Sequence, residues 1–133
     1  TFSIGRLPQK AYDAHRLSTD IQRAIAAAET PGARCEELYA LALKMADDAG
    51  FADHFMGFAQ KAKFVGHGTG LVINEQPVLG ARSKDTLEAG MCIALEPKFV
   101  IPGTDAVGVE DTFLVTPSGM ENLTPCDPAL QVL

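Results

Sequence analysis

The chain has 133 residues, of which 47 % are hydrophobic and 21 % charged, which is enough apolar material for one folded domain with a core. Its 17 acidic and 11 basic residues give a formal net charge of −6, which argues against nucleic acid or an anionic membrane as a partner, since both require clustered basic charge. No apolar run approaches the roughly 18 residues of a membrane span, and three widely spaced cysteines favour a reducing, cytoplasmic location over a disulfide framework.

The first half of the chain has helical patterns. In order, it predicts a short strand, two amphipathic helices and a segment without a clear pattern, over residues 1–5, 9–28, 34–49 and 51–63. Pro8 stands where helices often begin, because its missing N–H costs nothing there. The triplet Thr30-Pro31-Gly32 is expected to end the first helix and Gly50 the second.

The second half has β-type patterns. It predicts β structure over residues 64–79, 91–101, 106–116 and 121–124, a polar turn over 83–90 and an irregular tail over 125–133. Pro102-Gly103 separates the two middle runs and predicts an antiparallel hairpin, and Ser118-Gly119 predicts a further turn. Helices followed by strands indicate the α+β class, with two helices packed on one face of a curved, mainly antiparallel sheet.

Glu96 and Glu110 are charged residues inside apolar β-type runs, residues 93–97 and 107–111. Both lie seven positions from Gly103, so a symmetric hairpin would place them opposite each other with Cβ atoms roughly 5 Å apart. Two facing carboxylates repel each other. Either one of them is protonated, as in an acid–base dyad, or a cation lies between them.

The neighbours of this pair leave both explanations open. Most of those on the same face are small and leave room for a cation, namely Cys92, Ala94, Gly108 and Thr112. The simpler alternative is two solvated carboxylates on an open sheet face, with Lys98 as the neutralising partner. A register shift of one residue would place the two carboxylates on opposite faces.

His67 is the histidine with the strongest case for a functional role. It stands between Gly66 and Gly68, where the open backbone suits an imidazole that must point into a crowded site. His15 lies within a predicted helix and His54 lies beside an acidic residue in an irregular segment, so we expect packing or surface roles for both.

Four motifs in order along the chain resemble the C-terminal half of the catalytic domain of the pita-bread metallopeptidases, the family of methionine aminopeptidase, aminopeptidase P, prolidase and creatinase. They are the opening strand 1–5, the Gly-His-Gly-x-Gly segment at 66–70, Leu-Glu-Pro at 95–97 and Val-Glu-Asp-Thr at 109–112. The sequences of residues 66–79 and 113–116 resemble the Xaa-Pro peptidase branch of the family more than methionine aminopeptidase.

The resemblance implies metal-dependent hydrolysis of the N-terminal peptide bond of a peptide substrate, Xaa-Pro in type. In this family two Asp, one His and two Glu hold two divalent metals, and His67, Glu96 and Glu110 match the His and the two Glu. A metal-activated water attacks the peptide carbonyl, with His67 and Glu96 as the catalytic residues and Glu96 moving a proton to the leaving amine. Such ligands suit Mn, Co, Fe or Zn.

The same resemblance places the two Asp ligands upstream of Thr1. We therefore expect residues 1–133 to be a partial catalytic domain that is inactive by itself and holds no stable pair of metals. The aspartates within the first half of the chain lie in helix or loop contexts and match neither position: Asp13, Asp20, Asp47, Asp48 and Asp53.

Three further positions depart from the pattern and weaken the match to dipeptide prolidases. Asn74 stands where many members carry a second, substrate-contacting His, and as a substrate-binding residue it can donate a hydrogen bond but not a proton. Gly108 replaces an Arg that is common in prolidase-like members, and Lys63 stands where several have His.

Two expectations concern partners. The alternative to an enzyme is a non-catalytic pita-bread module that binds a peptide or protein, which the departures favour and the retained His67, Glu96 and Glu110 oppose. A half-fold should also leave a sheet edge or apolar face uncovered, so we expect a homo-oligomer.

Overall fold

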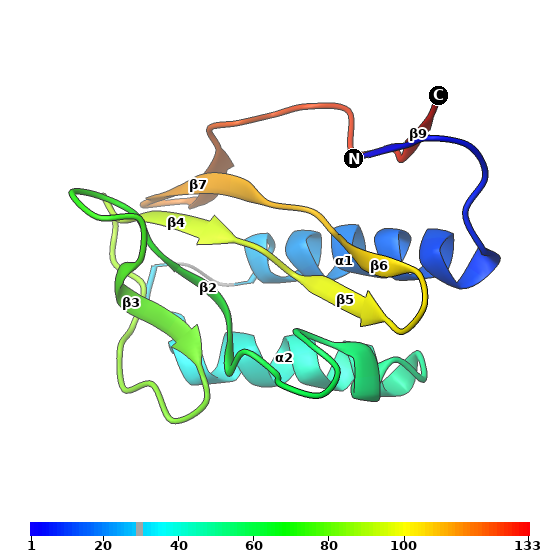
Figure 1. Ribbon diagram of the computed structural model, residues 1–133. Helices are drawn as coiled ribbons and strands as arrows, with labels where there is room; N and C mark the ends of the chain where they lie inside the picture. Colours follow the sequence, from blue (N-terminus) through cyan, green and yellow to red (C-terminus); the bar gives the residue numbers. More distant parts are fainter. Residues whose placement is uncertain (29–30) are drawn as a thin grey trace.

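The computed structural model describes residues 1–28 and 31–133, so Thr30 of the expected helix-ending triplet lies outside the described residues. Two helices lie along one side of the strands, and the two ends of the chain come together (Figure 1). This arrangement confirms the α+β class and the packing of two helices on a mainly antiparallel sheet. No helix in the described ranges has the length and apolar character to cross a membrane.

The helices α1 (Gln9–Ala26) and α2 (Cys35–Asp48) begin and end close to the expected positions. Pro8 occupies the N-cap of α1, which ends two residues earlier than predicted. Gly50 ends α2 with a φ of 73°, a backbone conformation that favours glycine. There the Gly50 and Phe51 amides donate to the carbonyls of Asp47 and Ala46 and satisfy the last turn.

The unassigned segment 51–63 contains a single 3₁₀ turn, η1 (Ala52–His54). The strands are β1 Phe2–Ser3, β2 Phe64–Gly68, β3 Glu75–Gly80, β4 Cys92–Leu95, β5 Lys98–Ile101, β6 Asp105–Gly108, β7 Asp111–Thr116, β8 Gly119–Asn122 and β9 Gln131–Val132. Five of them form an antiparallel sheet in the order β3-β2-β4-β7-β8. Strands β5 and β6 form a separate ladder, and β1 pairs in parallel with β9.

The predicted β runs were too long. The run 64–79 is two strands, because the chain reverses after Gly68 and β3 pairs antiparallel with β2. The runs 91–101 and 106–116 are each broken in two around Pro97, which has no N–H to donate to a ladder. The last expected strand, 121–124, begins at Gly119, and the tail 125–133 contains β9 because it pairs with the first strand.

The hairpin register is as expected. Pairs such as Leu95 with Asp111 in one ladder and Lys98 with Gly108 in the other are all centred on Gly103. Glu96 and Glu110 therefore hold opposite positions in the break between the ladders. Because the regular ladder is interrupted at these two residues, strand geometry alone does not fix the directions of their carboxylates.

The core lies between the helices and one face of the sheet. Ile21 and Ile25 of α1 and Leu38 of α2 belong to the same buried cluster as Leu95 and other alternate strand residues. Full burial of one such side chain contributes roughly 1.5–3 kcal/mol. The Gln22 side chain adds a buried hydrogen bond of 3.1 Å to the carbonyl of Leu95 and so links α1 to β4. This packing fixes the position of the strands that carry His67 and Glu96.

Candidate metal centre

The sheet face that points away from the helices carries the candidate site. Ile93 and Leu95 belong to the buried core, whereas Ala94 between them is outside that cluster and points to the other face. His67 pairs with Ala94 in the β2–β4 ladder and shares its face. Glu96, two residues further along the chain, lies on the same face.

His67 is held by the close approach of its neighbouring strands. A Cβ at Gly66 would lie 2.6 Å from the Ala94 carbonyl oxygen, and one at Gly68 would lie 2.4 Å from the Gln76 carbonyl oxygen. Neither glycine has a positive φ. The glycines on each side of His67 are thus required for strand packing, which corrects the expectation that they provide an open backbone.

The His67 ring faces the Glu96 carboxylate. Nδ1 lies 3.0 Å from the carbonyl oxygen of Gly68, which can only accept, so Nδ1 carries the hydrogen in that bond. Nε2 lies 3.5 Å from Oε1 of Glu96. When the imidazole is neutral, these two atoms face each other with lone pairs and no hydrogen between them. The pair is therefore complete only with a proton or another cation between them.

Lys98 supplies the nearest positive charge to the other carboxylate oxygen. Its ammonium forms an ion pair and hydrogen bond with Oε2 of Glu96. The Glu96 side chain is only 13 % exposed, and the Lys98 side chain is 41 % exposed. The neutralising partner expected for a pair of surface carboxylates is therefore present, but it contacts a carboxylate that is largely buried.

Glu110 lines the same cavity as Glu96, but this cavity is not lined by His67. A space of about 240 Å³ is lined by both carboxylates together with Lys98 and residues 106–109. Glu110 is exposed. Among the described residues, no three His, Cys, Asp or Glu side chains lie close enough together to form a metal-binding group. The structure thus brings together two of the three expected ligands.

Asn74 lies at the entrance to β3, next to the histidine. A cavity of about 520 Å³ is lined by Phe64, His67, Asn74, Glu75, Gln76 and Val78. The Phe64 ring packs edge-on against His67, with centroids 6.0 Å apart. Sequence reasoning missed Phe64, Gln76 and Val78. The pairing of His67 with Val78 brings these side chains to the site, and that pairing depends on the length of the β2–β3 loop.

The other histidines have structural surroundings. His15 is buried in α1, where burial lowers its pKa, and its Nε2 has no hydrogen-bond partner in the described residues. Nδ1 of His54 lies 2.9 Å from the carbonyl oxygen of Val100, and its ring stacks on Phe58. These contacts support the packing roles expected for both.

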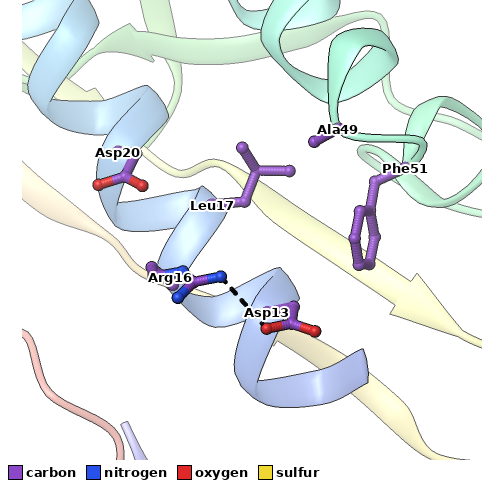
Figure 2. Close-up of a pocket in the computed structure, with 6 residues that line it drawn as sticks. All are labelled: Asp13, Arg16, Leu17, Asp20, Ala49 and Phe51. Carbon is purple, nitrogen blue, oxygen red and sulfur yellow. Dashed lines mark hydrogen bonds and ion pairs between the residues drawn. The ribbon is translucent and has the colours of Figure 1, made fainter. Parts of the chain in front are cut away.

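A third cavity lies on the helical side of the molecule (Figure 2). Its volume is about 320 Å³ and its lining residues are Asp13, Arg16, Leu17, Asp20, Ala49 and Phe51. Asp13 forms an ion pair of 3.3 Å with Arg16, and the close-up shows no such contact for Asp20. Two of the aspartates that match no ligand position, Asp13 and Asp20, therefore line a different cavity from His67.

The sequence profile of metallopeptidase family M24 matches residues 1–117. The chain belongs to metallopeptidase family M24. The match includes His67, Glu96 and Glu110 and covers most of the chain, so the pita-bread fold expected from the motifs is confirmed.

Relatives of this M24 chain include Xaa-Pro dipeptidases. An Xaa-Pro dipeptidase of Lactobacillus delbrueckii subsp. lactis is 31 % identical over 133 residues, which is 100 % of this chain and 34 % of that protein. The structure of an Xaa-Pro dipeptidase from Bacillus anthracis has a TM-score of 0.87 at 30 % identity, over 99 % of this chain and 36 % of that one. The chain thus spans about a third of the length of these relatives.

A similar fold also occurs in a protein that is not named as a peptidase. The N-terminal domain of FACT complex subunit SPT16 from Eremothecium gossypii has a TM-score of 0.81 at 20 % identity, over 99 % of this chain and 32 % of that one. At this identity the likeness shows the fold alone. The chemistry of this M24 chain must therefore be argued from its own side chains.

The donor set fits a divalent cation. Two atoms that each bind one cation at about 2.1 Å lie roughly 3.0–3.4 Å apart at octahedral or tetrahedral angles. Nε2 of His67 and Oε1 of Glu96 are 3.5 Å apart, and Nε2 carries the lone pair that a ligand needs. An imidazole nitrogen and carboxylate oxygens suit Mn, Co, Fe or Zn and do not select among them.

Proposed function

We propose that the protein containing this chain is a metal-dependent peptidase that hydrolyses the N-terminal bond of peptides, Xaa-Pro in type. The observation that carries the proposal is the His67–Glu96 pair, because the two facing lone pairs are stabilised by a cation between them. The pair occurs in a chain of family M24. The relatives named as Xaa-Pro dipeptidases support the substrate class.

In this proposal His67, Glu96 and Glu110 are metal ligands. Divalent cations held there would polarise the peptide carbonyl and make a water nucleophilic at neutral pH. The Gly68 carbonyl holds the His67 ring in the tautomer that presents Nε2. Glu96, beside the histidine and largely buried, moves a proton from the attacking water to the leaving amine.

Asn74 is proposed to contact the substrate from the rim of the 520 Å³ cavity that it shares with His67. Its amide can donate to a substrate carbonyl or accept from an amine. The apolar surface of Phe64 and Val78 in the same cavity suits the ring of a proline residue.

The location of the protein is proposed to be cytoplasmic. The three cysteines are not paired with one another, which is compatible with a reducing compartment.

We further propose that residues 1–133 form part of a catalytic domain and are inactive by themselves. This rests on the two ligands brought together here and on the absence, within the described residues, of a three-ligand group. The test is an assay of the isolated chain with Mn(II) or Co(II) and an Xaa-Pro peptide. Robust turnover would show that no further ligands are needed.

The substrate class is tested on the full-length protein. We expect metal-dependent, chelator-sensitive hydrolysis of dipeptides such as Leu-Pro and Met-Pro, and much slower hydrolysis of Leu-Ala and Met-Ala. Hydrolysis without proline preference would contradict the Xaa-Pro assignment while keeping the peptidase. No hydrolysis of any peptide in the presence of metal would favour the alternative, a non-catalytic module that binds a peptide or protein partner.

A further inference from the structure

The ion pair between Glu96 and Lys98 lies at the centre of the candidate site. Glu96 uses its two oxygens differently, because Oε1 faces Nε2 of His67 and Oε2 receives the Lys98 ammonium. Lys98 opens β5 and is two residues from Glu96, so both side chains emerge on the same face. A monovalent cation of the chain itself thus contacts the carboxylate to which we assign a divalent one.

The opposite strand leaves space for this lysine. Gly108 is the register partner of Lys98, and a Cβ at Gly108 would lie 2.6 Å from Cβ of Lys98 and 2.6 Å from the Pro97 carbonyl oxygen. A side chain at 108 therefore conflicts with the lysine stem. With glycine there, Lys98 lines the 240 Å³ cavity that both Glu96 and Glu110 also line.

We propose that Lys98 is a built-in counter-ion of Glu96 that competes with divalent metal for this carboxylate and so sets the metal affinity of the site. The inference rests on the proposed role of Glu96 as a ligand. A divalent metal at Glu96 brings two positive charges close to the Lys98 ammonium. The metal must therefore either displace Lys98 from the carboxylate or bind in spite of electrostatic repulsion from it. The partly exposed, flexible stem allows Lys98 to turn outward when metal binds.

Replacing Lys98 tests this role through two responses of opposite sign. In the full-length, metal-free protein, Lys98→Met keeps the apolar stem but leaves the largely buried Glu96 without its partner, so thermal stability should fall. In the same variant Mn(II), followed by calorimetric titration, should bind roughly tenfold more tightly, within the range expected for removal of one charge at this distance. Lys44→Met, which removes an exposed ion pair with Asp48 on α2, should change neither property.

A relocated cation separates charge from packing. In the double variant Lys98→Gly with Ala106→Lys, the positive charge comes from the opposite strand, at an exposed position that lines the same cavity as Glu96. Its Mn(II) affinity should return toward that of the wild type, whereas Lys98→Gly alone should bind more tightly.

Each outcome has one meaning. Mn(II) binding by Lys98→Met that is within twofold of the wild type, or weaker, would overturn the competition while leaving the peptidase proposal intact. Absence of saturable Mn(II) binding in both the wild type and Lys98→Met would contradict the proposed metal centre itself, and the inference with it.

Discussion

His15 is a buried histidine whose Nε2 lacks a hydrogen-bond partner in the described residues, and burial lowers its pKa in the folded protein. In the unfolded chain the pKa returns to about 6.5. As the pH falls through that value, the unfolded state takes up a proton that the folded state does not accept. The folded state is therefore favoured above about pH 6.5 and loses stability as the solution becomes more acidic.

Replacing His15 should remove this contribution. In His15→Leu, the free energy of unfolding between pH 7 and pH 5 should fall less steeply than in the wild type, by at most about 1.4 kcal/mol per pH unit. The apolar replacement leaves no buried polar atom behind. Urea unfolding curves at pH 5, 6 and 7 measure the difference, and parallel pH dependences for both proteins would show that His15 titrates alike in the two states.

Strand β2 depends on glycines that allow neighbouring strands to approach. Gly66→Ala would place Cβ 2.6 Å from a carbonyl oxygen of β4, where a backbone atom must shift. We expect a loss of about 2–3 kcal/mol in the free energy of unfolding.

Gly70→Ala is the matched control, because its new Cβ would meet the end of the flexible Glu75 side chain. We expect it to cost under about 0.5 kcal/mol. Chemical denaturation of both variants measures the contrast. If the two cost the same, the tight β2–β4 contact at Gly66 is not what requires glycine there.

Local elements were predictable because their signals are local. The helix end at Gly50 and the hairpin centred on Gly103 depend on residues next to one another in sequence. Pairing of β1 with β9 depends on residues at the two ends of the chain, and no local pattern reports it. Pro97 is itself a local signal for a strand break, but the predicted β run 91–101 extends across it, whereas β4 ends at Leu95 and β5 begins at Lys98.

The candidate site was predictable only in part, for a similar reason. The opposite positions of Glu96 and Glu110 follow from hairpin symmetry, as expected. Contact of His67 with Glu96 requires the register of β2 against β4, which long-range packing sets. The family resemblance indicated that His67 and Glu96 lie together. Neither hairpin symmetry nor the resemblance indicated that Glu110 would be exposed and, among the described residues, outside a three-ligand group.

For the whole molecule, apolar side chains remain exposed around the two ends of the chain. Phe2 is 73 % and Ile4 95 % exposed, and Leu133 beside them is 75 % exposed. The outer strands β3 and β8 of the five-stranded sheet also have one unpaired edge each among the described residues. These surfaces are consistent with the expectation that the 133-residue chain self-associates, which we propose here.

Size-exclusion chromatography with light scattering tests this association. We expect a dimer or larger species at high protein concentration, and a shift toward monomer in Ile4→Asp, because a charge disfavours burial of that surface. A clean monomer at every concentration would contradict the proposal.

His67 and Glu96 are proposed to hold a divalent metal in the full-length protein, and Mn(II) binding to that protein tests this claim. Calorimetric titration should show saturable binding that is weakened at least a hundredfold in both His67→Ala and Glu96→Gln. Glu121→Gln, which alters an exposed carboxylate on β8, should bind like the wild type. Undiminished Mn(II) binding in His67→Ala and Glu96→Gln would contradict the claim.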